Sequence, residues 1–106
     1  MLIRALEPLE GIERMRSFRG MRTRRGARPD VQLTSGPARL CQALDIDRRF
    51  DGADLCAPDA RVFLEEGIPI PDDAAATGPR IGVRGDEVAV TVPWRFTVRD
   101  SRYVSR

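Results

Sequence analysis

Residues 33–44 read Leu-Thr-Ser-Gly-Pro-Ala-Arg-Leu-Cys-Gln-Ala-Leu and carry the clearest helix start in the chain. Hydroxyl residues favour the position that caps a helix, and proline favours the first turn. The spacing of Leu40, Cys41 and Leu44 then predicts one buried stripe. We therefore expect a helix that begins at residues 34–37 and is capped by a hydroxyl side chain.

The chain before this helix predicts a strand and a second, shorter helix. Residues 2–6 (Leu-Ile-Arg-Ala-Leu) are typical of a short, largely buried strand, and Leu9, Ile12 and Met15 recur at helical spacing. A buried strand needs neighbours on its edges. A chain that opens with one therefore resembles the later part of something larger.

The chain after this helix is rich in β-forming runs. Asp51-Gly52 predicts a turn, and residues 68–77 are typical of a linker loop. Gly85-Asp86 fits a two-residue hairpin turn between two of the runs. The predicted strands are residues 61–65, 80–84, 87–92 and 94–98. The sequence thus predicts an α+β fold.

Composition excludes several kinds of chemistry. A length of 106 residues indicates one domain, and the chain contains no histidine. Catalytic systems that pair serine or cysteine with histidine, and imidazole-bound zinc, are therefore excluded. Cys41 and Cys56 are too few for a zinc site or a disulfide scaffold, so we expect two buried thiols in a reducing cytoplasm. No apolar run is long enough to span a membrane, and the first residues lack a signal peptide's apolar core.

Charge is distributed unevenly along the chain. Residues 1–50 carry eleven arginines against six acidic residues, whereas residues 51–106 carry seven against ten. Seven arginines fall within residues 14–28, a stretch without acidic residues, and guanidinium groups suit phosphate oxygens. The helix start near Ser35 also suits a phosphate. This pattern indicates a nucleic-acid surface, with a solvated basic loop as the alternative; the aromatic residues lie mostly in apolar runs and are expected in the core.

Three segments, in order, resemble the alkyladenine (3-methyladenine) DNA glycosylases. They are Leu-Ile-Arg-Ala-Leu-Glu-Pro-Leu-Glu-Gly at residues 2–11, the helix start at residues 33–44, and Pro-Arg-Ile-Gly-Val at 79–83 followed by Pro-Trp-Arg-Phe-Thr-Val-Arg at 93–99. The resemblance covers nearly the whole chain but only the C-terminal part of that family. Residues 84–92 depart from it, because the family usually has small residues and a short irregular segment there.

The resemblance implies a curved antiparallel sheet with short helices, and residues 1–106 as a single partial domain. The implied activity is base excision repair of duplex DNA: hydrolysis of the N-glycosidic bond of alkylated or deaminated purines, flipped out of the stack. The family's catalytic glutamate and most of its base pocket have no counterpart in this chain. We therefore expect the isolated chain to be inactive, and the alternative is a non-catalytic nucleic-acid-binding remnant.

The resemblance also assigns roles to individual residues. Arg4 matches the arginine that holds the attacking water, and Ile81 matches the residue whose main-chain carbonyl accepts from it. Gly36, Arg39 and Arg48 match the phosphate-contacting side. Charge alone adds three members of the basic stretch to the DNA-binding set: Arg22, Arg24 and Arg25. No cofactor or metal is implied, and we expect a cytoplasmic monomer at the bacterial nucleoid.

Overall fold

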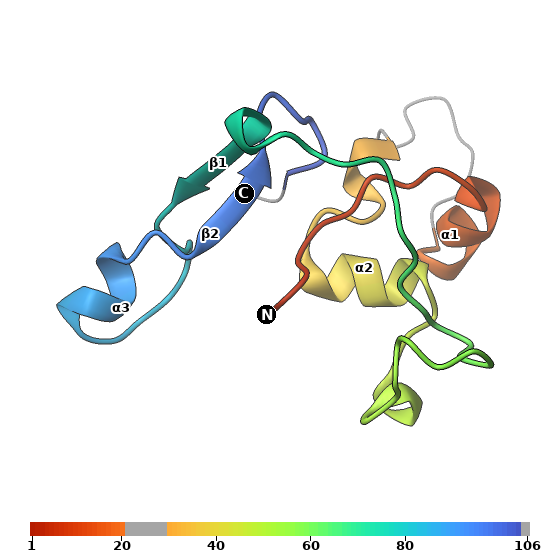
Figure 1. The fold of residues 1–106 in the computed structure, drawn as a ribbon. Coiled ribbons are helices and arrows are strands. Elements are labelled where there is room, and N and C mark those ends of the chain that lie inside the picture. Colours follow the sequence, from red (N-terminus) through yellow and green to blue (C-terminus); the bar gives the residue numbers. More distant parts are fainter. Residues whose placement is uncertain (21–29, 105–106) are drawn as a thin grey trace.

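The computed structural model describes residues 1–20 and 30–104 and shows a small α+β fold with an antiparallel sheet (Figure 1), which confirms the predicted fold class. Among these residues no helix is long and apolar enough to cross a membrane. The helices are α1 (Ile12–Phe18), α2 (Pro37–Ala43) and α3 (Glu87–Thr91), the strands are β1 (Ala75–Gly78) and β2 (Arg95–Val98), and 3-10 turns cover Asp30–Gln32, Arg48–Phe50 and Asp72–Ala74.

The buried part of the molecule lies around α2 and the residues just before it. Leu33 is 0% exposed, and Leu40, Ala43 and Pro8 are also buried. Helix α1 packs against α2. The Arg16 guanidinium on α1 donates a 2.9 Å hydrogen bond to Asp30, which ties α1 to the segment that leads into this core.

Helix α2 begins at the predicted place but without the predicted cap. Pro37 occupies the first turn, whereas the capping residue is Gly36, whose φ of 130° is a backbone conformation that favours glycine. The Thr34 hydroxyl donates a 2.5 Å hydrogen bond to a main-chain carbonyl of the N-terminal segment. The Ser35 hydroxyl accepts one from Arg39 at 3.1 Å. Both hydroxyls are engaged elsewhere, so the prediction of a hydroxyl cap is wrong.

The buried face of α2 also differs from the predicted stripe. Leu40 is buried as expected, but Ala43 is its buried neighbour one turn later, while Leu44 is exposed and Cys41 is half-buried. Cys56 is exposed, so the prediction of two buried thiols is wrong. Residues three apart share a helix face, which explains why Leu40 and Ala43 are buried together.

Helix α1 confirms the helix predicted over residues 9–15, displaced by three positions. Gly11 precedes it with a φ of 71°, in the left-handed region where a side chain is strained, and the helix starts directly after this turn. The turn predicted at residues 51–52 is also present, with Gly52 at a φ of 76°.

The N-terminal segment forms no continuous strand. Ala5 makes an isolated antiparallel bridge to Ser35, and Leu2 is exposed. The strand predicted at residues 2–6 is therefore reduced to one bridge. Among the described residues the named strands β1 and β2 pair with each other, so none of them lies along this segment to extend the bridge.

Strands β1 and β2 pair antiparallel, from Ala75 opposite Val98 to Gly78 opposite Arg95. The predicted strand at residues 94–98 is thus confirmed, but its partner comes from the segment predicted as a linker loop. The strands predicted at residues 61–65 and 80–84 are wrong, because both stretches are irregular. Whether a segment forms a strand depends on which other segment of the chain lies beside it. The β propensity of its own residues does not indicate that neighbour.

The third wrong strand, at residues 87–92, is helix α3. The Asp86 carboxylate accepts a 2.8 Å hydrogen bond from the Ala89 N–H and caps the helix. Gly85-Asp86 is therefore a helix start rather than a hairpin turn. An aspartate cap followed by an acidic residue at Glu87 stabilises a helix end and outweighs the β-branched residues that follow.

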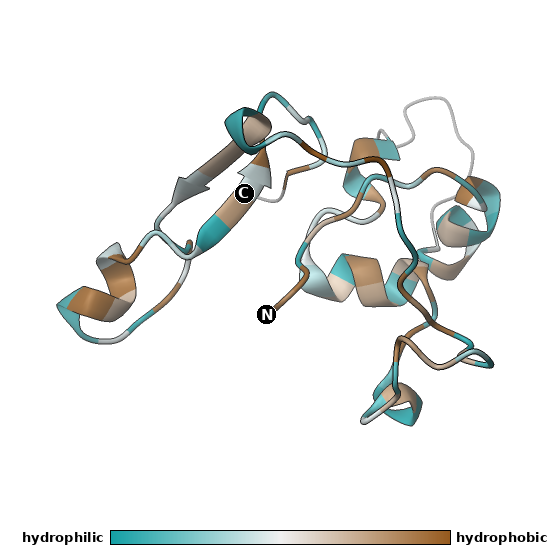
Figure 2. Cartoon of the chain, in the orientation of Figure 1, coloured by the Kyte–Doolittle hydropathy of each residue, from teal (hydrophilic) through white to brown (hydrophobic). Residues whose placement is uncertain are grey.

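Two lobes are visible in Figure 1, one around α1 and α2 and the other made of the β1–β2 ribbon and α3. Figure 2 shows apolar segments along the chain in both lobes. The aromatic residues predicted for the core are not in it: Trp94 is 63% exposed, Phe96 is 71% exposed and Phe63 is exposed. That prediction is wrong for these three residues.

Candidate DNA-backbone and water-positioning site

Arg4 lies on the N-terminal segment beside the start of α2. The bridge between Ala5 and Ser35 places the residue after Arg4 next to the residue before Gly36. Arg4 is exposed, and within residues 1–20 and 30–104 its guanidinium forms no hydrogen bond or ion pair. The group is therefore available to an anion or a water molecule.

Arg39 occupies the same corner of the molecule. Its Nη1 donates to the Ser35 Oγ at 3.1 Å and approaches the Ser35 carbonyl at 3.5 Å, so the guanidinium lies at the N-terminal end of α2. Helix α2 has seven residues, and a dipole this short adds little. The positive charge at this corner comes from the side chains, and the structure brings Arg4, Gly36 and Arg39 into one region.

Arg48 lies further along the chain, in the 3-10 turn Arg48–Phe50. It is exposed, and no ion pair involves it in the described part of the chain. Its neighbour Arg49 is engaged, because its Nε donates to the Asp47 carboxylate at 2.9 Å and its guanidinium lies 3.8 Å from Asp45. The hydrogen bond from Arg49 lowers the pKa of Asp47 below its ordinary value.

We expect this depressed pKa to be measurable by NMR titration of the Asp47 carboxylate. A carboxylate with a lowered folded pKa stabilises the fold at neutral pH, and this contribution disappears as the pH falls through the folded value. Arg49→Gln should return the Asp47 midpoint toward that of an exposed aspartate, while Arg48→Gln should leave it unchanged. Equal shifts in the two variants would contradict the pairing.

Ile81 lies in the other lobe, in the irregular segment between β1 and α3. It is 52% exposed, and no hydrogen bond joins it to Arg4 among the residues described. Its neighbour Arg80 holds this segment: Nη2 donates to the Ala89 carbonyl at 3.1 Å, and the guanidinium lies 5.3 Å from the Trp94 ring centroid. Arg80 was not among the predicted site residues, although an arginine between apolar runs that contain a tryptophan is a signal for such stacking.

The basic stretch predicted at residues 14–28 is partly neutralised in the structure. Arg16 forms ion pairs with Asp30 and, at 2.7 Å, with Glu13, and these carboxylates raise its pKa. Acidic residues on either side of the stretch therefore offset some of its charge. The predicted DNA-binding residues Arg22, Arg24 and Arg25 lie outside the described residues.

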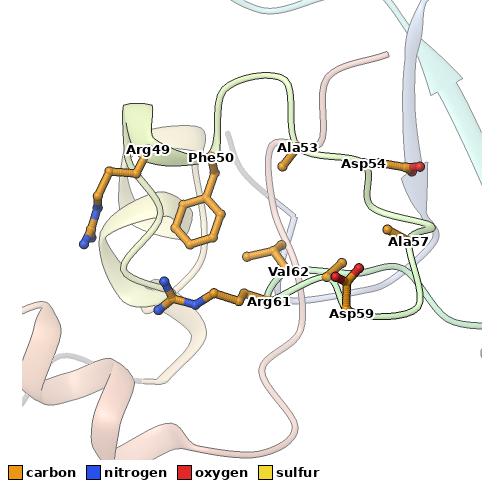
Figure 3. A pocket seen from close by; sticks show the side chains of 9 residues that line it. Arg49, Phe50, Ala53, Asp54, Ala57, Asp59, Arg61 and Val62 are labelled. Carbon is orange, nitrogen blue, oxygen red and sulfur yellow. The ribbon is translucent and has the colours of Figure 1, made fainter.

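One shallow pocket of about 330 Å³ opens beside the turn Arg48–Phe50 (Figure 3). Its wall includes a cation–π contact, with the Arg61 guanidinium 5.7 Å from the Phe50 ring centroid. No predicted site residue lines it. The lining residues are Arg49, Phe50, Ala53, Asp54, Ala57, Asp59, Ala60, Arg61 and Val62. Across the described ranges, no group of three or more cysteine or acidic side chains is arranged to hold a metal ion.

Comparison of this sequence with known proteins shows the family to which the chain belongs. The model of the methylpurine-DNA glycosylase family matches residues 1–102. The chain belongs to the methylpurine-DNA glycosylase family. This membership confirms the resemblance seen in the three sequence segments.

Individual members of the methylpurine-DNA glycosylase family are similar over almost the whole chain. A protein of Burkholderia cenocepacia, provisionally named 3-methyladenine DNA glycosylase, is 49% identical over 105 residues, which are 98% of this chain and 46% of that protein. One from Gloeobacter violaceus with the same provisional name is 49% identical over 99% of this chain and 43% of its own length. The human DNA-3-methyladenine glycosylase is 45% identical over 98% of this chain and 36% of its own. The chain therefore spans less than half the length of these curated relatives.

Proposed function

We propose that this chain supplies the DNA-backbone contacts and the water-positioning groups of a methylpurine-DNA glycosylase that excises alkylated purines from duplex DNA. The observation that carries this proposal is the corner where the Ala5–Ser35 bridge sets Arg4, which has no ion pair with any described residue, beside Gly36 and Arg39. Cations concentrated at one corner suit a phosphate backbone.

In this reaction a water oxygen attacks the sugar C1′ atom while the bond from C1′ to the purine nitrogen breaks. A general base takes the proton of the water. The guanidinium of Arg4 stays protonated at neutral pH and cannot serve as that base, so its role is to hold the water. The resemblance gives the Ile81 carbonyl a hydrogen bond from this water, but Ile81 lies in the other lobe, so its role rests on the resemblance and not on the geometry. We propose that the base is a carboxylate of the glycosylase that lies outside these 106 residues.

We expect the chain to bind duplex DNA without sequence preference and with steep salt dependence, because arginine–phosphate contacts release counterions. Fluorescence anisotropy of a labelled 20-base-pair duplex, repeated across a salt series, gives the slope of log K against log salt. The double substitution Arg39→Gln with Arg48→Gln should flatten this slope by up to about 1.8, which is about 0.9 for each lost phosphate contact.

Arg49→Gln is the matched control, because it removes the same charge next to Arg48 from a guanidinium that Asp47 already holds. Its slope should stay at the wild-type value. A triple substitution to glutamine at Arg22, Arg24 and Arg25 extends the experiment to the basic stretch and should also flatten the slope. If Arg49→Gln flattens the slope as much per arginine as the double variant, binding depends on net charge alone and the proposed backbone surface is wrong.

A further inference from the structure

Thr34 is the one buried polar side chain in the part of the chain that the structure describes. It is 1% exposed and follows Leu33 in the small core beside α2. A buried hydroxyl is normally hydrogen-bonded, because it has given up its contacts with water. The Thr34 hydroxyl donates a 2.5 Å hydrogen bond to the main-chain carbonyl of Leu6, 28 positions earlier in the sequence. This core hydroxyl therefore holds the N-terminal segment.

The hydroxyl makes the shorter of two hydrogen bonds between Thr34 and Leu6. The Leu6 N–H donates to the Thr34 carbonyl at 3.3 Å, which is long for a bond between main-chain groups. The hydroxyl bond, at 2.5 Å, lies at the short end of the range for two oxygen atoms. Removal of the hydroxyl would therefore leave only the longer bond of this pair.

The residues before Leu6 have little else to fix them. Leu2 is 70% exposed and Leu6 is 42% exposed, so these side chains bury little apolar surface, and the segment forms one isolated bridge instead of a strand. Arg4 is exposed and stands two positions before Leu6, about 7 Å along an extended backbone. The place of Arg4 beside α2 therefore depends on the bridge and on the hydrogen bond from Thr34.

We propose that Thr34 is a positioning residue for purine excision: its buried hydroxyl sets Arg4 at the start of α2 and so places the water that Arg4 holds. This inference rests on the proposed function, which gives Arg4 that water. Thr34 is buried, so it acts through Arg4 and not on the DNA. A displacement of about 1 Å at a reacting group can cost up to about a hundredfold in rate. The rate of excision, and not DNA affinity, is therefore the quantity that depends on Thr34.

Single-turnover excision tests this role, in a chimera that joins the chain to the unmatched part of the Burkholderia cenocepacia relative. Thr34→Val keeps the branched side chain but removes the donor, and it should lower the rate at least fivefold while DNA affinity stays within twofold. Thr34→Ser keeps the donor but loses a buried methyl group, so it should bring the rate back to within twofold of wild type at a lower melting temperature. A role in packing alone would make Thr34→Ser the slower variant.

Thr91→Val is the matched control. The Thr91 hydroxyl also donates to a main-chain carbonyl, that of Glu87 at 2.7 Å, but it does so on the exposed helix α3. The substitution removes the same kind of hydrogen bond away from Arg4. It should leave both the excision rate and DNA affinity unchanged.

A double-variant cycle shows whether Thr34 acts through Arg4. In a chimera that already carries Arg4→Ala, Thr34→Val should lower the rate less than twofold further, because both changes release the same water. If the two effects multiply instead, Thr34 acts by another route and the inference is wrong.

Hydrogen exchange of the chain itself tests the hydroxyl contact without the chimera. Thr34→Val should speed exchange of the Leu6 amide at least fivefold, because the N-terminal segment then opens more often. Thr34→Ser and Thr91→Val should leave this exchange within twofold of wild type. An unchanged Leu6 amide in Thr34→Val would overturn the inference, since the hydroxyl would then not hold the segment.

The two proposals can fail separately. An Arg4→Ala chimera that keeps the wild-type rate would overturn the water-positioning role of Arg4, on which this inference rests. A loss of rate in Arg4→Ala without one in Thr34→Val would overturn the role of Thr34 alone. A Thr34→Val chimera that loses as much DNA affinity as rate would place Thr34 in the DNA-backbone surface, which also contradicts the inference.

Discussion

Arg4→Ala is expected to lower the single-turnover rate of purine excision at least tenfold, a loss of about 1.4 kcal/mol or more of transition-state stabilisation. The host for this measurement is a chimera that joins the chain to the unmatched part of the Burkholderia cenocepacia relative. A residue that positions the attacking water acts mainly in the transition state, so the excision rate should fall while DNA affinity changes far less.

Two further substitutions separate positioning from structure. Arg4→Lys should restore the rate in part, because an ammonium group keeps the charge but lacks the planar fork of donors. Arg49→Ala removes an equal charge from a guanidinium that Asp47 holds, and it should leave the rate within twofold of the wild type. If Arg4→Ala keeps the excision rate within twofold and lowers only the melting temperature, Arg4 is a structural residue and the water-positioning role is wrong.

The chain by itself is expected to excise no base from a duplex that contains hypoxanthine or ethenoadenine. It has no histidine, and the resemblance leaves the family's catalytic glutamate without a counterpart among these residues. Its cations are all arginines, which cannot accept a proton from water at neutral pH.

Incubation with the purified chain, followed by alkali to cleave abasic sites, measures this directly. The chimera under the same conditions is the positive control. Strand scission by the chain alone above the buffer control would contradict the prediction. It would place a working general base among the exposed carboxylates of these residues.

Local sequence signals predicted secondary structure correctly where a single residue fixes the backbone conformation. Pro37 in the first turn of α2 and Gly52 in its turn act through backbone geometry that does not depend on distant contacts. The family was also recognisable from the sequence, because three ordered segments carry it.

Predictions that depended on a distant partner were less reliable. Val88 and Val90 indicated a strand, but Asp86 caps a helix there, and a local hydrogen bond outweighed β propensity. Sequence also placed Phe96 and Trp94 in a core, because apolar rings are normally buried. In the structure both are exposed, since the described residues include no layer to cover them.

The same division applies to the candidate site. The sequence by itself determined the excess of arginine, the absence of histidine, a helix start within residues 34–37 and the family that assigns roles to Arg4 and Ile81. Tertiary structure decided which of these residues meet. The Ala5–Ser35 bridge brings Arg4 to the start of α2. Ile81 lies in the other lobe, next to Arg80, whose guanidinium contacts the Trp94 ring. Such long-range contacts depend on which surfaces pack against each other in the folded protein. Neither the secondary-structure propensity of a residue nor its spacing along the chain indicates which surfaces these are.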